Sequence, residues 1–389
     1  PLVARALLAS AADHAAVGDF AESAALLERY FAGYKREDDA RHAARQRRGA
    51  SVPERAYDET KARTALHDAA VLREARGELA KALQDRQAAL KQWPRATDRA
   101  EQMLALNLLR AKLGEPARAA RELFALGRAA PGNAALQLTA FREAARLFTR
   151  LHETGNAISA WSDLEWAYRV ASKAHSTLPA EASAAAAEAH LALGTQTFEE
   201  FKNQRIEPPL ARTLSRKLAL LQQVKKRAEE TVAMRQAEPA VCALVQLGEA
   251  QILLAQSIAE SPAPRGLNAQ EKQLYRDALQ EKAAPVLDEA RATLTGADAK
   301  ARELGVAGNC VARATALLEN LGKKPAARAE LAIARLPIAG TPSLVSSDGQ
   351  AAEPGYARPS TGTAPVSKPD GTTTRSSPAQ LEGTTRRNP

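Results

Sequence analysis

Residues 114–133 read GEPARAARELFALGRAAPGN, and this stretch decides the fold. Gly114 suits the left-handed conformation that commonly ends a helix, because glycine has no Cβ. Ala119, five residues later, is small enough for two antiparallel helices to approach closely. Pro131 then stops the second helix, since proline lacks the amide donor that a helix interior needs. The stretch therefore predicts a pair of antiparallel helices joined by a tight turn.

The same pattern recurs along the chain, between segments of helical period, at Gly18, Gly77, Gly155 and Gly322. Five residues after these glycines the side chains are small, namely Ser23, Ala82, Ala160 and Ala327. The first four glycines of the whole series are 59, 37 and 41 residues apart, so some helices are longer or some loops are inserted. The recurrence predicts an all-α chain that forms a solenoid of antiparallel helix pairs.

Composition agrees with an all-α fold. The 389 residues are 45% hydrophobic but only 4% aromatic, and alanine, the best helix former, is abundant. This excludes most β-rich and α/β catalytic folds. The formal net charge is +9, but 54 basic and 45 acidic residues are interleaved almost throughout, as on a solvated helical surface.

Three regions are expected from the pattern. Residues 1–178 carry the helical repeats, with a charged insertion around 35–59 that we interpret as a helix extension and a mobile loop. Residues 179–337 form divergent repeats and long helices. Residues 338–389 are rich in Pro, Ser, Thr and Gly and are predicted to form a disordered tail, because they cannot bury enough apolar surface.

Several local signals fall in the second region. Pro208-Pro209 separates two helices, and Asn268 with Glu271 marks a helix start. Pro285 is expected to kink or interrupt the helix that follows. Residues 212–227 predict a basic amphipathic helix, whose core face holds Leu214, Leu218, Leu221 and Val224 and whose outer face holds Arg216, Lys217, Lys225, Lys226 and Arg227.

Catalytic signatures are missing from the sequence. The six histidines have no metal-ligand spacing, and no phosphate loop, dinucleotide fingerprint or nucleophile elbow occurs. We therefore expect no enzyme activity, no metal, no cofactor and no small-molecule substrate. Cys242 and Cys310 are expected to be free and buried, with a disulfide as the alternative in an oxidising compartment. Trp161, Trp166 and Tyr168 are interpreted as core between repeats, or alternatively as a recognition patch.

The stretches 77–94 and 114–133 resemble the tetratricopeptide repeat, in their Gly-Glu turns, alanine spacing and closing prolines. In that family the first helix of each pair lines a groove that binds peptides or proteins. The resemblance implies a peptide-binding groove with candidate polar contacts at His67, Glu74, Glu101, Lys112, Arg142 and His152. Val71, Leu108 and Thr149 occupy the neighbouring groove positions.

Residues 179–321 resemble a second, more specific group in segments such as Phe198-Glu-Glu-Phe201, Pro208-Pro209-Leu210 and Tyr275-Arg-Asp-Ala-Leu279. This is a myxobacterial group of tetratricopeptide proteins that includes an outer-membrane lipoprotein of the gliding-motility machinery. Cys310 departs from its pattern, which has a large aromatic residue there. The resemblance implies a scaffold in a multi-protein envelope complex in the periplasm or at the periplasmic face of the outer membrane.

Two readings of function follow. The first is a non-enzymatic protein-interaction scaffold of a cell-envelope assembly. No transmembrane segment is expected in this chain, although a lipid anchor upstream of Pro1 is compatible with the pattern. The alternative is a cytoplasmic regulatory or nucleic-acid-associated adaptor that uses the basic surface. We do not expect nucleic-acid binding, because aromatic residues are not interleaved with the basic ones.

Overall fold

The computed structural model describes residues 2–47, 51–52, 54–174 and 178–322, and within them the chain forms thirteen α-helices and no strand. This confirms the all-α prediction. The first six helices are α1 (Leu2–Ala16), α2 (Phe20–Gln46), α3 (Glu59–Ala75), α4 (Leu79–Gln92), α5 (Arg99–Lys112) and α6 (Pro116–Ala129). The other seven are α7 (Ala134–Arg150), α8 (Thr154–Ala174), α9 (Ala180–Asn203), α10 (Leu210–Ala233), α11 (Ala237–Ala259), α12 (Ala269–Glu303) and α13 (Asn309–Asn320).

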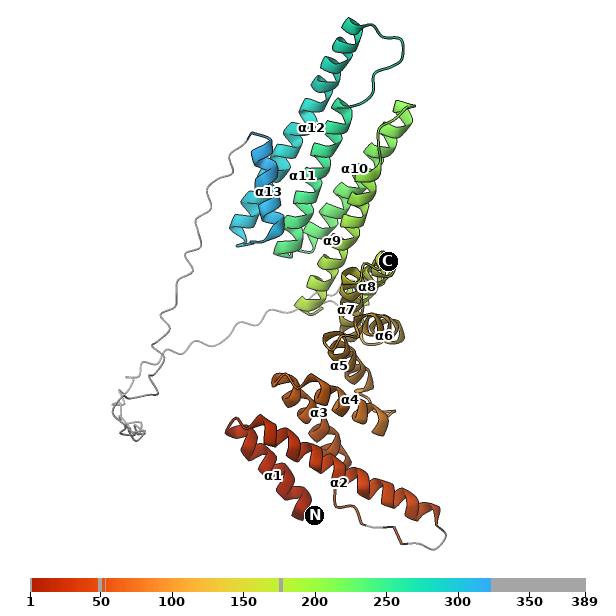
Figure 1. Cartoon of the computed structure of the whole chain (residues 1–389), viewed down its shortest axis with the longest axis vertical. Coiled ribbons are helices and arrows are strands. Elements are labelled where there is room, and N and C mark those ends of the chain that lie inside the picture. The colour runs from red at the N-terminus through yellow and green to blue at the C-terminus, as the bar shows by residue number, and fades with distance from the viewer. Residues whose placement is uncertain (1, 48–50, 53, 175–177, 323–389) are drawn as a thin grey trace, which may run out of the picture. The chain divides into compact units, whose positions relative to one another are not determined.

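Each helix packs against the next one in the chain (Figure 1). In addition, α5 contacts α7, α7 contacts α9, α9 contacts α11, and α11 contacts α13. The odd-numbered helices from α5 to α13 therefore form a row. Consecutive helices of this row contact each other, although an even-numbered helix lies between them in sequence. Packing limited to near neighbours is what distinguishes a repeat solenoid from a globular bundle. The structure thus confirms the solenoid of antiparallel helix pairs.

The predicted turns occur at three of the first four glycines. Gly18, Gly77 and Gly114 have φ of 81°, 76° and 92°, in the left-handed region that favours glycine. The fourth prediction is wrong, because Gly155 lies inside α8 and the left-handed residue is His152, with φ of 58°. The helix pair α7–α8 consequently begins its second helix three residues earlier than the glycine spacing indicates.

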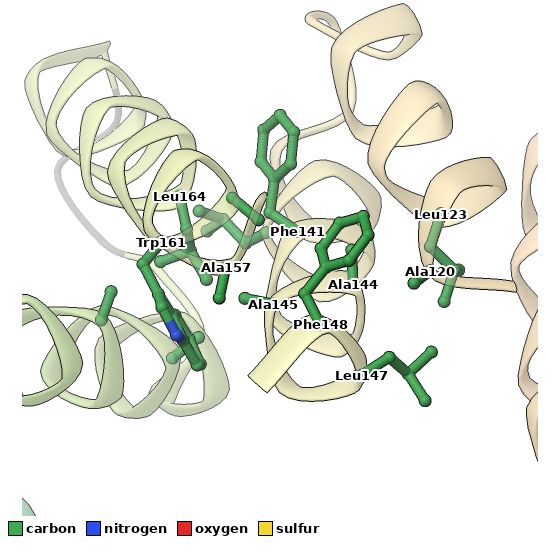
Figure 2. Packing of buried hydrophobic residues seen from close by; sticks show 14 of the residues in the cluster. Ala120, Leu123, Phe141, Ala144, Ala145, Leu147, Phe148, Ala157, Trp161 and Leu164 are labelled. Carbon is green, nitrogen blue, oxygen red and sulfur yellow. The ribbon is translucent and has the colours of Figure 1, made fainter. Parts of the chain in front are cut away.

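The largest cluster of buried hydrophobic residues lies among α6, α7, α8 and α9. Figure 2 shows the side chains of Phe141 and Phe148 on α7, which belong to one buried cluster with Leu123 of α6 and Leu164 of α8. Packing is close enough that a Cβ on Gly127 would stand 2.6 Å from the Phe141 ring. Each buried phenylalanine stabilises the fold by roughly 2 to 3 kcal/mol relative to an exposed one. This core fixes α7 between α6 and α8.

The charged insertion contains the expected helix extension, since α2 continues to Gln46. The end of the loop before α3 is bound to α2. Glu37 accepts hydrogen bonds from the backbone amides of Ala56 and Tyr57 at 2.9 and 3.1 Å, and the hydroxyl of Tyr30 accepts one from Asp58 at 3.2 Å. Acidic and aromatic side chains of α2 thus fix the entry into α3.

The helix start predicted at Asn268 is confirmed, since Asn268 forms a capping box with Glu271. Of the two outcomes expected at Pro285, the interruption is wrong, because α12 continues through it to Glu303, and the kink stays a prediction. The predicted tail, 338–389, and the helix expected after Gly322 lie outside the described residues.

Helix α11 is the central helix of the second region. By length and composition it is the one described helix that could cross a membrane, yet 61% of its most apolar window is buried inside the fold. It contacts α9, α10, α12 and α13. Its apolarity therefore matches that of a core helix surrounded by others.

The two cysteines are bonded to each other. Cys242 of α11 and Cys310 of α13 form a disulfide across a Cα–Cα distance of 5.1 Å. The expectation of free thiols is wrong, and the disulfide alternative is correct. The reason is that α11 and α13 are neighbours in the row of odd-numbered helices, which brings residues 68 apart in sequence into contact.

The face assigned to the basic helix, α10, also needs correction. Val224 is buried as expected, but Lys217 is only 3% exposed while Leu218 is 41% exposed. The Nζ atom of Lys217 donates hydrogen bonds to the carbonyls of Phe201 and Gln204 at the end of α9. Lys217 therefore lies on the buried face of α10, and Leu218 lies on its exposed face.

Candidate peptide-binding surface

Two adjoining clefts lie along α9 and contain part of the predicted groove. The first, of about 480 Å³, is bounded by α7, α8 and α9. Its apolar lining includes Ile158, Trp161 and Leu191, and its polar lining includes His152 and Glu199. An apolar floor with polar groups around it is typical of a pocket that accepts a side chain.

The second cleft, of about 570 Å³, lies among α7, α9 and the start of α11. Arg142 and Arg146 line it from α7, and Glu238 lines it from α11. Glu188 and Leu191 belong to both clefts. We refer to the two clefts together as the α7–α9 surface.

Glu188 is the electrostatic centre of this surface. Its carboxylate accepts hydrogen bonds from Nε of Arg142 at 2.7 Å and from Nε of Arg146 at 2.6 Å. Hydrogen bonding to Glu188 raises the pKa of Arg146 above its ordinary value, so this guanidinium stays charged. Arg146 also pairs with Glu143 at 3.1 Å. Charge is therefore balanced within the cluster, and a partner's carboxylate would compete with Glu188 for the two arginines.

The structure brings together two of the six predicted contact residues. Arg142 lines the second cleft and His152 the first, on the two sides of Glu188. His152 does not project from a helix face, as the repeat register implied, but from the turn after α7. Thr149, a neighbouring groove position, lines the first cleft as well.

The other four predicted residues lie on α3 and α5, outside these clefts. His67 is hydrogen-bonded through Nδ1 to Gln102 at 3.0 Å, and Glu101 accepts from Asn133 at 3.2 Å. Glu74 is paired with the buried Arg86 of α4, at 2.8 Å from its Nε. Lys112 is exposed at the last position of α5. Glu74 thus joins two helices, and its role as a ligand contact stays a prediction.

Sequence reasoning missed Arg146, Glu188 and Leu191. Arg146 follows Arg142 by four residues, which places both on one helix face, so the spacing contained a signal. Glu188 interrupts a run of alanines at 184–187, a position where a charge needs a partner. Its partners, however, lie more than forty residues away in sequence.

The aromatic residues of α8 divide between core and surface. Trp161 is buried and Tyr168 is packed against the same core cluster, as we interpreted them. Trp166, in contrast, is 58% exposed, so the core interpretation is wrong for this residue.

Within the described residues, no group of three or more His, Cys, Asp or Glu side chains is placed to hold a metal ion. No family profile matches the chain, and no curated protein sequence matches it. Among solved structures, the chain is similar to a circular tandem repeat protein with novel repeat topology and enhanced subunit contact surfaces. That likeness has 14% sequence identity and a TM-score of 0.23, over 82% of this chain and 75% of the other.

Proposed function

We propose that this chain is a non-enzymatic scaffold that binds a segment of a partner protein along the α7–α9 surface. The observation that carries the proposal is the apolar pocket around Trp161 and Leu191, directly beside the Arg142–Glu188–Arg146 cluster. The pocket suits an apolar side chain of the partner, and the cluster suits a neighbouring carboxylate. A helical-repeat fold supports this reading, since repeat proteins act through extended surfaces of this kind.

We further propose that the partner belongs to a multi-protein assembly of a bacterial cell envelope, such as the gliding-motility machinery. The Cys242–Cys310 disulfide supports an exported protein, because disulfides persist in oxidising compartments such as the periplasm. The resemblance of residues 179–321 to an envelope group of tetratricopeptide proteins points the same way.

The binding proposal is tested by filling the apolar pocket. Ala192→Arg places a long side chain in the first cleft, and Ala180→Arg, on an exposed position of the same helix, is the matched control. Both variants and the wild-type chain are used to capture partners from an envelope extract. We expect Ala192→Arg to lose a partner that the wild-type chain and Ala180→Arg retain. Equal capture by all three proteins contradicts the proposal.

Salt dependence tests the role of the arginines. Affinity for the captured partner is measured at low and high salt for the wild-type chain and for Arg142→Gln/Arg146→Gln. We expect the wild-type affinity to fall with salt and the double variant to be weaker and less salt-dependent, because complementary charges are screened. A double variant with unchanged affinity and salt dependence places the contact elsewhere.

The alternative, a cytoplasmic adaptor, rests on the exposed cations of α10, among them Arg212 and Arg216. If substitution of those two residues abolishes partner binding while Ala192→Arg does not, the adaptor replaces the scaffold reading. The thiol state of Cys242 and Cys310 in cells distinguishes the two compartments, since a cytoplasmic protein would hold them reduced.

A further inference from the structure

A third cleft, of about 620 Å³, lies between α8, α9 and α10. His190 and Thr197 line it from α9. Successive helical residues are rotated by about 100°, so these two residues lie on the face of α9 roughly opposite Glu188 and Leu191. This cleft is therefore separate from the α7–α9 surface.

His190 lines the cleft, and one of its two ring nitrogens lacks a hydrogen-bond partner. It is only 8% exposed, and among the described residues its Nδ1 atom makes no hydrogen bond. The nearest carboxylate oxygen, on Glu230, is 3.8 Å away. A buried polar atom without a partner is costly, and such atoms are rare in folded proteins. Because Nδ1 is itself shielded from solvent, a ligand in the cleft meets His190 through the other atoms of the ring that lines it.

The charges that line the cleft leave an excess of one cation, because Arg169, Lys226 and Arg227 face only Glu165 and Glu230. Arg227 forms two ion pairs, at 3.1 Å with Glu165 and at 3.2 Å with Glu230. Arg169 pairs with Glu165 at 3.2 Å, and Lys226 is 3.9 Å from Glu230. Both of these outer cations are largely exposed, so an incoming carboxylate could reach them.

An apolar strip lies on α8 next to Glu165 and Arg169, which line the cleft. Trp166 and Val170 are exposed and one helical turn apart, and Arg169, a lining residue, lies between them in sequence. The other two tryptophans, Trp93 and Trp161, are buried. Exposed tryptophan beside arginine is typical of the residues that dominate binding energy at protein interfaces.

We propose that the cleft and the Trp166–Val170 strip form a second docking site, which takes a partner segment carrying a carboxylate side chain next to an apolar one. The carboxylate enters beside Arg169 and Lys226 and reaches toward His190, and the apolar side chain packs on Trp166. Charge complementarity selects the acidic residue, since one more anion balances the cleft. The chain would then hold two partner segments on opposite faces of α9.

The test uses a random dodecapeptide library displayed on phage and panned on the full chain. Recovered peptides are synthesised, and their affinities are measured by isothermal titration calorimetry. We expect recovered peptides with Asp or Glu next to Leu or Phe, and we expect their affinity to fall by about tenfold in Arg169→Gln/Lys226→Gln, equivalent to two weak charge pairs. Trp166→Ala should weaken the same peptides, measured by calorimetry.

The matched control is Arg212→Gln/Arg216→Gln, which also removes two exposed cations from this part of the chain. Both positions lie at least about 15 Å along α10 from Lys226, at 1.5 Å per residue. We expect this control to leave peptide affinity unchanged. If it weakens binding as much as Arg169→Gln/Lys226→Gln does, the attraction is general to the basic helix and the docking site is wrong.

His190→Leu separates a ligand contact from a structural role. Because Nδ1 has no partner, the substitution should leave the melting temperature unchanged or higher, while peptide affinity falls. A lower melting temperature with unchanged affinity contradicts the proposal.

Three other outcomes also overturn it. Acidic peptides that bind Arg169→Gln/Lys226→Gln as well as wild type do not use this cleft, and peptides lost only from Ala192→Arg belong to the α7–α9 surface. If sedimentation shows a dimer that Trp166→Ala abolishes, a second copy of the chain covers the strip and no acidic segment is needed.

Discussion

The ammonium group of Lys217 lies 4.6 Å from the centre of the Phe201 ring and donates a hydrogen bond of 2.8 Å to the Gln204 carbonyl. A single lysine thus satisfies the C-terminal end of α9 and contacts a buried aromatic ring. Burial lowers the pKa of Lys217 from its ordinary value, which is the cost of this arrangement. The favourable dipole at a helix C-terminus offsets part of that cost.

Lys217→Met should lower the free energy of unfolding by about 1 to 2 kcal/mol, because the last carbonyls of α9 lose a charged donor while the volume is kept. Urea titration followed by circular dichroism measures the change. Lys225→Met, at an exposed position of the same helix, should change stability by less than about 0.5 kcal/mol. Equal effects of the two substitutions would mean that the Lys217 contacts contribute nothing.

The raised pKa of Asp85 predicts that the stability of the chain depends on pH. Desolvation and the nearby Glu28 raise its pKa to about 7, well above the ordinary value of 3.8. The native state then holds a proton that the unfolded state releases, so stability from this group is complete below about pH 4 and is lost as the pH rises to about 7. Asp85→Asn should therefore stabilise the chain at pH 8 by on the order of 1 to 2 kcal/mol, after discounting for partial solvent contact.

The comparison is made by thermal unfolding of both proteins at pH 4.5 and pH 8. The difference between them should be small at the lower pH and large at the higher one. A constant difference across this range would show that Asp85 does not titrate in the folded chain.

Ala119 is completely buried between helices, so Ala119→Leu should overpack the α5–α6 pair and its neighbours at a cost of about 1 to 3 kcal/mol. Ala125→Leu lies at an exposed position of the same helix and is the matched control. Denaturant titration should separate the two variants clearly. Similar midpoints would show that the closeness of these helices does not limit side-chain size.

Replacing both cysteines by serine should reduce stability through the unfolded state. The disulfide closes a segment of 68 residues, and the chain-entropy estimate for such a loop is about 4 kcal/mol, of which disulfides typically deliver about 2 to 4 kcal/mol. Differential scanning calorimetry with and without reductant gives the effect for the wild-type chain. A double-serine variant that is insensitive to reductant is the control, and an unchanged wild-type midpoint would contradict the expectation.

Periodicity in the sequence predicted the helices and their pairing but not their exact faces. Lys217 and Leu218 are adjacent, so a rotation of about 100° about the helix axis decides which one is buried. The rotation depends on where the C-terminal end of α9 lies. The last backbone carbonyls of α9 have no partner within the helix, so they favour a lysine over a leucine at the facing position of α10. Local patterns do not contain this information.

The candidate site was only partly predictable for a similar reason. Arg142 and His152 both line the α7–α9 surface, but only the place of Arg142 on a helix agrees with the repeat pattern, since His152 lies in a turn. Glu188 and His190 come from a region where the repeat signal fades, and their surroundings are formed by α7, α8 and α10. Contacts between such distant segments are set by packing of whole helices, which no spacing within the sequence reveals.

The bond between α11 and α13 also determines how the chain responds to mechanical load. If tension were applied beyond residue 322, α13 could unravel only as far as Cys310, and the force would then pass through the disulfide to Cys242. The whole of α12 and most of α11 lie within the covalent loop and would be shielded from extension. An oxidised chain should therefore lengthen less under tension than a reduced one, by the contour length of the residues between the two cysteines.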